Sequence, residues 1–414
     1  MLSTFFFILA TLFLSLNFIR PFGLAISDWL YFGALFSTLF ETLISKKHNF
    51  SIWAPRSSFF WSAMLITLGA VISLANSNNP SIAIVELFQQ LYVITVFISL
   101  IWIMVRRGKI ELIITVFIIS GVFSASVAAI DFFMGTHYGP ILSGTPQILL
   151  WGRYAGTLGH PNKLGYFLVI TTILTFYKLF ITKGRKNKFG SVIIILMAIL
   201  VQGFGIYLSG SVTAYMGVLI GLFCLLYIAV PSRIRIIFLV LGFLLVLAAL
   251  LINMIWINTI FNQPLGIPES SLIGKGISRV LNITAGERVD LYQLSIDYIV
   301  QSPIIGAGYD QISTSGISQG ARQLPGTIHN SLLEIWYVGG LFAFLGWLIV
   351  HIYILKIALG NIFRQSKGQF ILSIALSTAV IATLLMDQFQ NSIYLREKWL
   401  VIGLLAGLNW KDKA

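Results

Sequence analysis

GERVDLYQLSIDYIVQSPIIGAGYDQ, residues 286–311, and TIHNSLLEIWYVGG, residues 327–340, frame the stretch that decides the fold of this chain. The stretch lies mostly in the only long polar segment of an otherwise apolar sequence, and its end opens the next apolar run. It holds Arg288, a Pro-x-x-Gly-x-Gly turn and the pair His329-Asn330. Because an arginine and a histidine are costly to keep at the edge of a bilayer, we expect the chemistry of the protein here.

The composition predicts an integral membrane protein. Of the 414 residues, 57% are hydrophobic and only 10% are charged, whereas a soluble domain carries about 25% charged residues. The single cysteine, Cys224, allows neither an intramolecular disulfide nor a cysteine-based metal site. The run 2–19 lacks a basic start and a small-residue cleavage site, so we expect a first membrane helix instead of a signal peptide.

Apolar runs of about 20 residues, the length that crosses a bilayer, recur along the whole chain. They predict an all-α membrane protein with about twelve transmembrane helices, eleven being the main alternative. Residues 1–257 would hold helices one to nine, with an external loop at about 133–164. Residues 258–330 would form a long external loop, and 331–414 helices ten to twelve. The predicted spans are 2–19, 26–45, 58–75, 82–105, 110–132, 165–181, 191–208, 211–230, 236–257, 331–355, 370–386 and 394–410.

The net charge of +13 is explained by membrane topology and does not call for a nucleic acid partner. With twelve spans, 18 of the 27 basic residues fall on one face, which the positive-inside rule makes cytoplasmic, together with both termini. The other nine fall on the opposite face, where topology gives no reason for them. These nine are Arg20, Arg153, Lys163, Lys275, Arg279, Arg288, Arg322, Arg396 and Lys398.

The long loop has helical periodicity over 289–301, which predicts an amphipathic helix lying on the membrane surface or against other helices. Arg288 would project away from the polar stripe of this helix, where it suits an anionic group such as a diphosphate. Pairing with a nearby carboxylate is the alternative. Pro303 should end the helix, and Gly306 and Gly308 predict a tight turn with positive φ. Phosphate binding and simple chain reversal explain these glycines equally well.

His329-Asn330 precedes a helix N-terminus, for which Asn330 or Ser331 is the predicted cap. His329 would then sit at the positive end of the helix dipole, which favours the neutral imidazole. A neutral imidazole can accept the proton of a hydroxyl or bond a phosphate. A lone histidine is more often structural, but the adjacent arginine-bearing loop favours a functional role.

With Arg288, the Pro303–Gly308 turn, His329-Asn330 and Gly340, the sequence resembles the O-antigen ligase and O-antigen polymerase superfamily of bacterial envelope glycan enzymes. A further matching piece is RYAGTLGHPNKLG, residues 153–165, which is similar to the Arg…Pro-Asn-x-x-Gly element of that family. The pieces occur in order, on one predicted face, and cover about half of the chain.

The resemblance implies a metal-independent, inverting glycosyltransferase of the C type in the bacterial inner membrane, with its active site on the periplasmic face. Its donor would be an undecaprenyl-diphosphate-linked glycan and its acceptor another glycan or lipid A-core. No cofactor is implied. His329 and Arg288 would be catalytic, His329 as the base towards the acceptor hydroxyl. The residues expected to bind the diphosphate and substrate are Arg153, Asn162, Arg279, Arg322 and Asn330.

One departure from the family concerns residues 208–214, LSGSVTA, which lack the arginine that many ligases carry at the start of the eighth helix. Arg153, Arg279 or Arg322 would supply the missing charge. Because polymerases vary here, the gap favours a polymerase over a ligase. A lipid-linked glycan transporter is a distant alternative, since the halves of the chain show no internal repeat.

Six other charged residues are secondary candidates for a functional role, but each is expected to belong to a structural ion pair or to lie at a solvated helix end. His160-Pro161-Asn162 is explained by turn chemistry as well as by function, and His351 is expected on the cytoplasmic side of its helix. The secondary candidates are Asp131, Glu86, Asp387 and Arg396-Glu397-Lys398.

Overall fold

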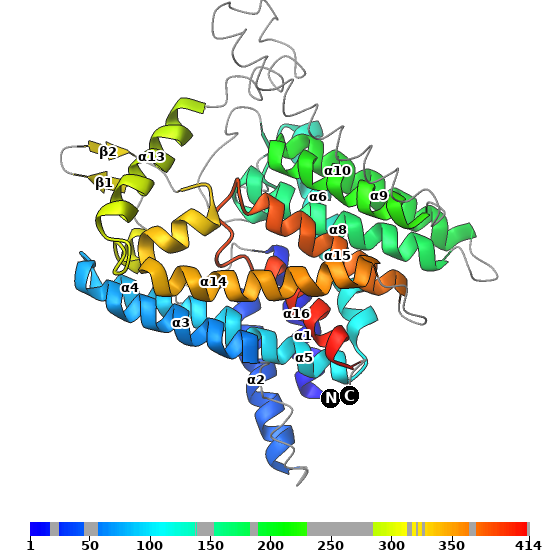
Figure 1. Cartoon of the computed structure of the whole chain (residues 1–414). Coiled ribbons are helices and arrows are strands. Elements are labelled where there is room, and N and C mark those ends of the chain that lie inside the picture. Colours follow the sequence, from blue (N-terminus) through cyan, green and yellow to red (C-terminus); the bar gives the residue numbers. More distant parts are fainter. Residues whose placement is uncertain are drawn as a thin grey trace, which may run out of the picture.

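A computed structural model of the chain describes residues 1–16, 25–44, 57–136, 138, 153–182, 189–229, 285–312, 317–319, 322–324, 328–363 and 370–411. Apart from one short hairpin, the regular structure in these residues is helical (Figure 1). The predicted all-α membrane class is therefore confirmed. The predicted spans coincide with helices, except the ninth, 236–257, which lies outside the described residues.

The α-helices are α1 (Leu2–Leu12), α2 (Ile26–Ile44), α3 (Ser57–Ser73), α4 (Pro80–Leu91), α5 (Ile98–Arg106), α6 (Ile110–Met134), α8 (Pro161–Thr182), α9 (Phe189–Ser209), α10 (Val212–Ala229), α13 (Ala285–Gln301), α14 (Ser331–Phe363), α15 (Phe370–Met386) and α16 (Arg396–Lys411). Short 3₁₀ turns are η1 (Phe13–Ser15), η4 (Leu74–Asn76), η6 (Gly156–Leu158) and η8 (Tyr309–Ile312), and the π-helical turn η5 (Tyr92–Phe97) joins α4 to α5. Strands β1 (Ile317–Gln319) and β2 (Arg322–Leu324) pair antiparallel.

Among the described residues, six helical segments are long and apolar enough to cross a membrane. They are Ser57–Asn76, Pro80–Arg106, Ile110–Met134, Pro161–Thr182, Phe189–Ser209 and Ser331–Ile362. Three shorter apolar helices, Leu2–Ser15, Val212–Phe223 and Phe370–Met386, add to the apolar bundle. Helices α2 and α16 are not among these nine.

Close contact between α3 and α14 depends on small residues. A Cβ on Gly69 would lie 2.5 Å from the backbone nitrogen of Ala343, and one on Gly346 would lie 2.7 Å from the carbonyl oxygen of Ser62. The Ser62 hydroxyl donates to the Gly346 carbonyl at 2.7 Å. The two backbones therefore touch, as small residues allow in membrane helix pairs.

A kink at Gly340 divides α14 into two helical parts. Gly340 has φ 64° and ψ −166°, a conformation that only glycine adopts readily. A Cβ at this position would lie 2.0 Å from the carbonyl oxygen of Ile304. The kink therefore forms around the turn that follows α13, which docks onto the backbone of α14.

The Pro303–Gly308 turn binds the carbonyl groups that the kink exposes. The backbone N–H groups of Ala307 and Gly308 donate to the carbonyl oxygens of Tyr337 and Val338, at 2.7 and 3.0 Å. Gly306 and Gly308 have φ 78° and 106°, so the predicted positive-φ turn is confirmed. Because two of its N–H groups bond α14, the structure favours chain reversal and docking over phosphate binding by this turn.

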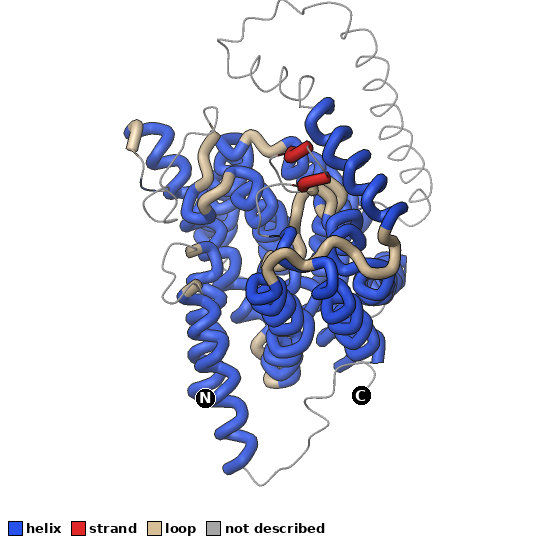
Figure 2. Tube along the Cα trace, turned by 90° about the vertical axis from the view of Figure 1, so that its left-hand side faces the viewer, coloured by secondary structure: helices blue, strands red, loops and turns tan. Residues whose placement is uncertain are grey.

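The predicted amphipathic helix is α13, which begins a few residues before 289 and ends at Gln301, ahead of Pro303. Leu294 and Ile299 are buried, while Gln293, Asp297 and Gln301 are exposed. Both termini of the chain lie at the opposite end of the molecule from α13 and the hairpin (Figures 1 and 2).

Candidate functional site

His329 lies at the N-terminus of α14, held between α13 and the helix cap. The hydroxyl of Tyr292 on α13 donates to the carbonyl oxygen of His329 at 3.1 Å. The Asn330 side-chain oxygen accepts from the N–H groups of Leu332 and Leu333 at 3.0 and 2.9 Å, so Asn330 is the cap. His329 is therefore placed at the positive end of a helix dipole, as predicted.

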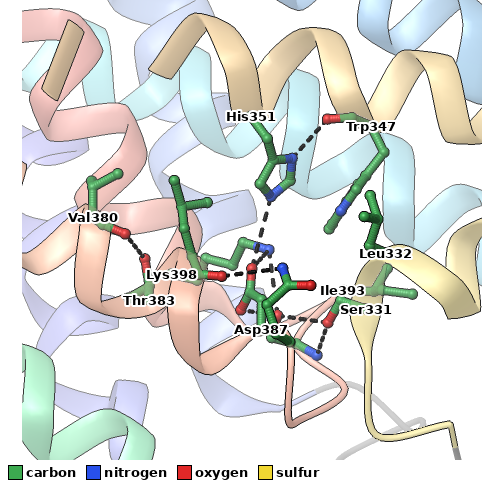
Figure 3. Close-up of polar contacts among 12 residues, drawn as sticks. Ser331, Leu332, Trp347, His351, Val380, Thr383, Asp387, Ile393 and Lys398 are labelled. Atoms are coloured by element: carbon green, nitrogen blue, oxygen red, sulfur yellow. Dashed lines mark hydrogen bonds and ion pairs between the residues drawn. The ribbon is translucent and has the colours of Figure 1, made fainter. Parts of the chain in front are cut away.

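A turn after α15 fixes the first residue of α14. The Ser331 N–H donates to the carbonyl oxygen of Asp387 at 2.9 Å, and its hydroxyl donates to the carbonyl oxygen of Gln390 at 2.8 Å. The N–H of Ser392 donates back to the Ser331 hydroxyl at 2.9 Å. These bonds hold Ser331, the first residue of α14, against the end of α15 (Figure 3). His329 precedes Ser331 by two residues.

Below this turn lies a buried ion pair. The Lys398 ammonium is 2.5 Å from an Asp387 carboxylate oxygen, and the two residues are 0% and 2% exposed. Tyr166 on α8 donates its hydroxyl to the same carboxylate at 2.9 Å. The His351 Nε2 atom lies 3.8 Å from Asp387 (Figure 3). Asp387 is thus an ion-pair partner, as expected for the secondary candidates, and no described contact links its side chain to His329.

His351 was expected on the cytoplasmic side of its helix, and the structure adds that its ring is close to the start of that helix. Its ring lies beside Asp387, whose carbonyl bonds Ser331 at the opposite end of α14. The kink at Gly340 explains this position. In a bent helix, a residue 20 positions after the first residue lies closer to that first residue than it would in a straight helix. Residue counting along a straight helix could not show this.

Arg153 reaches the junction between α9 and α10. Its Nε donates to the carbonyl oxygen of Ser209 at 2.6 Å, and its Nη2 donates to the Asn162 side-chain oxygen at 2.5 Å. A Cβ on Gly210 would lie 3.3 Å from the Arg153 side chain, so this glycine leaves room for it. Residues 208–214 lack the arginine that the family resemblance led us to expect. Arg153 brings a guanidinium to that junction from a distant part of the sequence.

The segment that carries Arg153 is anchored from both sides. The N–H of Tyr154 donates to the carbonyl oxygen of Leu208 at 3.0 Å, which ties it to the end of α9. Gly156 has φ 52°, and a Cβ there would lie 2.5 Å from the Ser124 carbonyl oxygen on α6. Backbone contacts therefore fix the position of Arg153.

His160 connects this segment electrostatically to His329. Its Nδ1 accepts from the Asn162 N–H at 3.1 Å, so the proton of the neutral ring is on Nε2. Burial lowers the pKa of His160 to about 4, helped by the cations Lys163 and Arg153 and by His329 when its ring is protonated. His160 is therefore neutral at pH 7, and it lies within electrostatic range of Lys163, Arg153 and His329.

The structure brings together some of the predicted site residues and leaves others outside the described part. Arg153 and Asn162 contact each other directly, and His329 and Asn330 adjoin at the start of α14. The backbone of Arg288 is in the first turn of α13 and that of Arg322 begins β2. The side chains of both, and all of Arg279, lie outside the described residues.

Lys163 and His160 were not among the predicted site residues, although they share a segment with Arg153 and Asn162. The signal that could have found them is spacing. His160 precedes α8 and Lys163 falls in its first turn, so both lie close to Asn162. The remaining secondary candidates are structural where contacts are described. Asp28 pairs with Arg396, and Asp131 accepts from Thr136 and the N–H of Tyr138.

Residues 193–348 match the O-antigen ligase family. The matched segment contains Arg288, His329, Asn330 and the Gly340 kink, so it carries one half of the site, while Arg153 and Asn162 lie before it. The predicted resemblance to O-antigen ligases and polymerases is confirmed by this match. No curated protein matches the chain.

Proposed function

We propose, from the match of residues 193–348 to the O-antigen ligase family, that this membrane protein is an inverting glycosyltransferase with a polyprenyl-diphosphate donor. The donor would be an undecaprenyl-diphosphate-linked glycan in the bacterial inner membrane, and transfer would occur on the periplasmic face. The observation that carries the proposal is the position of Arg153. It links the segment holding Asn162, His160 and Lys163 to the α9–α10 junction, and His160 of that segment lies within electrostatic range of His329.

The diphosphate of the donor would be bound by cations at this junction. Arg153 is held in one orientation by Ser209 and Asn162, and a fixed guanidinium recognises phosphate oxygens well. Lys163, Arg288, Arg279 and Arg322 are the further cations proposed to bind it. As the bond from the sugar to the diphosphate breaks, negative charge develops on the leaving group, and cations fixed beforehand stabilise it.

His329 would act as the general base. The oxygen of an acceptor hydroxyl attacks the anomeric carbon of the donor sugar while the bond to the diphosphate oxygen breaks. The hydroxyl proton passes to His329, and undecaprenyl diphosphate leaves with the electron pair. A single displacement of this kind inverts the anomeric centre. The positive end of α14 supports the role, because it disfavours the protonated form of His329.

The acceptor distinguishes two enzymes with the same donor chemistry. The absence of an arginine in residues 208–214 favoured a polymerase that extends a lipid-linked glycan, and that is the first candidate. Arg153 weakens this argument because its guanidinium reaches the same junction. A ligase that transfers the glycan to lipid A-core is therefore retained as the second candidate.

The test is complementation of a deletion strain with His329→Ala and Arg153→Ala, with envelope glycans separated on a gel. Loss of a general base lowers the rate by about 10²–10⁴-fold, so we expect His329→Ala to abolish the glycan product at normal expression. Lys178→Ala is the control, since Lys178 pairs with Glu111 near the end of α8 that is opposite to Asn162 and Lys163. Wild-type glycans from both site variants would refute the proposal.

The parent deletion separates the two acceptors. Single repeat units that accumulate without chains indicate a polymerase. Long chains that remain lipid-linked or free, and never reach lipid A-core, indicate a ligase.

A further inference from the structure

A pocket of about 440 Å³ opens between α2, α4 and the start of α16. Its wall includes Phe32 of α2, Val85 and Phe88 of α4, Arg396 and Glu397 of α16, and Lys163 from the segment that carries Arg153. We call it the α2/α4/α16 pocket. The bonds of Arg153 and the cap of His329 lie outside this pocket, and Lys163 is the wall residue that it shares with the proposed donor site.

The mouth of this pocket is apolar and faces outward. Val85 is 55% exposed and Phe88 is 67% exposed, and both lie in the helical segment Pro80–Arg106, which is apolar enough to span a membrane. Exposed apolar side chains on such a segment face lipid. A ligand entering here therefore has an apolar part that can remain in the bilayer.

The inner end is polar and its charges balance. Arg396 and Lys163 are matched by Asp28 and Glu397, and Arg396 forms a bidentate pair with Asp28. Two carboxylates in the wall disfavour a diphosphate, because like charges repel at close range. A neutral, hydrogen-bonding group fits the balance better than an anion does.

Buried polar atoms at this inner end have unused hydrogen-bonding capacity. Glu397 is 5% exposed, and its Oε1 has no hydrogen-bond partner among the described residues. The Tyr92 hydroxyl, also in the wall, is buried and without a partner in the same part of the chain. A buried polar atom without a partner is costly, so a ligand that supplies hydroxyl groups would satisfy both.

We propose that the α2/α4/α16 pocket binds the saccharide end of a membrane-anchored acceptor. Sugar hydroxyls donate to Glu397 and accept from Tyr92, while the lipid anchor leaves past Val85 and Phe88. Lys163 in the pocket wall belongs to the same segment as Arg153 and Asn162, which connects the pocket to the proposed donor site. This assignment rests on the proposed function, because it supplies the second substrate of that reaction.

The experiment is photolabelling of the purified full-length chain in nanodiscs with octyl β-glucoside that carries a diazirine in its alkyl chain. We expect labelling of residues 26–44 and 80–97, competed by unlabelled octyl β-glucoside and not by undecaprenyl diphosphate. Glu397→Gln should lower labelling about five-fold or more, since it removes a charged acceptor of hydrogen bonds. Glu111→Gln, a carboxylate outside the pocket wall, should leave labelling unchanged.

A second pair of variants tests the mouth. Val85→Trp should narrow it and lower labelling, whereas Val71→Trp, which changes an exposed residue of α3 outside the pocket wall, should not. Equal competition by phosphatidylglycerol would mean a general lipid groove, and competition by undecaprenyl diphosphate would mean a donor site. Either result overturns the proposal. It is also overturned if neither Glu397→Gln nor Val85→Trp changes the amount of labelling.

Photolabelling does not require glycan transfer. The test of the acceptor pocket is therefore independent of the test of the glycosyltransferase mechanism. Glycan synthesis that persists in His329→Ala overturns the glycosyltransferase mechanism, whatever the labelling shows. Glycan synthesis that depends on His329, together with labelling that is insensitive to Glu397→Gln, overturns the acceptor pocket alone.

Discussion

Arg153 and His160 show how single side chains gain their roles from surroundings that are distant in sequence. The Arg153 side chain bonds the carbonyl oxygen of Ser209, 56 positions along the chain. It thereby brings a cation to the α9–α10 junction, where residues 208–214 have none. His160 loses its tendency to protonate because it is buried among Lys163, Arg153 and His329. At this scale, the residue type is fixed by the sequence and its chemistry is set by its neighbours.

The low pKa of His160 predicts a pH-dependent stability. Its pKa is about 4 in the folded protein and about 6.5 in an unfolded chain. The unfolded state therefore binds the proton first, and the stabilising effect is complete above pH 6.5 and is lost as the pH falls towards 4. The loss amounts to about 3 kcal/mol at full protonation.

Thermal unfolding of wild type and His160→Asn, followed between pH 4 and 7.5, measures this effect. The variant should lose less stability than wild type as the pH falls, because the other titrating groups are common to both proteins. Parallel pH profiles would contradict the assignment.

The kinked α14 and the turn that follows α13 form one backbone assembly. The Pro303–Gly308 turn bonds the carbonyls of Tyr337 and Val338, and Gly340 lies against Ile304. The glycines are required because backbone meets backbone, which leaves no space for a Cβ. The assembly fixes the angle between α13, which approaches His329 through Tyr292, and the rest of the bundle.

Gly340→Ala should destabilise the protein by about 3 kcal/mol or more, since it combines a strained backbone with a steric clash. Gly203→Ala is the matched control, because Gly203 lies in α9 with nothing within 4 Å of the added Cβ. The control should change stability by less than about 1 kcal/mol. Fluorescence-detected size-exclusion after heating compares the two, and equal survival of both variants would contradict this account of the kink.

Across the whole molecule, the Asp387–Lys398 pair connects four helices at the end where the site lies. Asp387 follows α15, Lys398 belongs to α16, Tyr166 to α8 and His351 to α14 (Figure 3). The carbonyl of Asp387 also holds Ser331, two residues after His329. The pair therefore positions the α14 N-terminus without itself touching His329 in any described contact.

Lys398→Met should destabilise the protein by about 3–5 kcal/mol, because it leaves the Asp387 carboxylate buried without its cation. Adding Asp387→Asn should recover part of this loss, since the unpaired charge is then gone. Lys178→Met, at the partly exposed pair with Glu111, should lower stability by less than about 1 kcal/mol. A denaturation series on these three variants and on Asp387→Asn alone checks the pair, and purely additive losses at positions 387 and 398 would show that the two charges are not coupled.

The sequence by itself determined the membrane class, the apolar helices, the amphipathic helix before Pro303, the positive-φ turn and a helix cap at Asn330 or Ser331, of which the structure selects Asn330. Each of these depends on periodicity or local backbone chemistry within a few residues. Only the tertiary structure decided that Arg153 serves the α9–α10 junction, that His160 is neutral beside Lys163, and that His351 lies against Asp387. These depend on contacts between segments far apart in the chain, and on a kink whose direction one glycine permits but does not specify. Local pattern carries no information about which distant partners a side chain will meet, and that is the physical limit of the prediction.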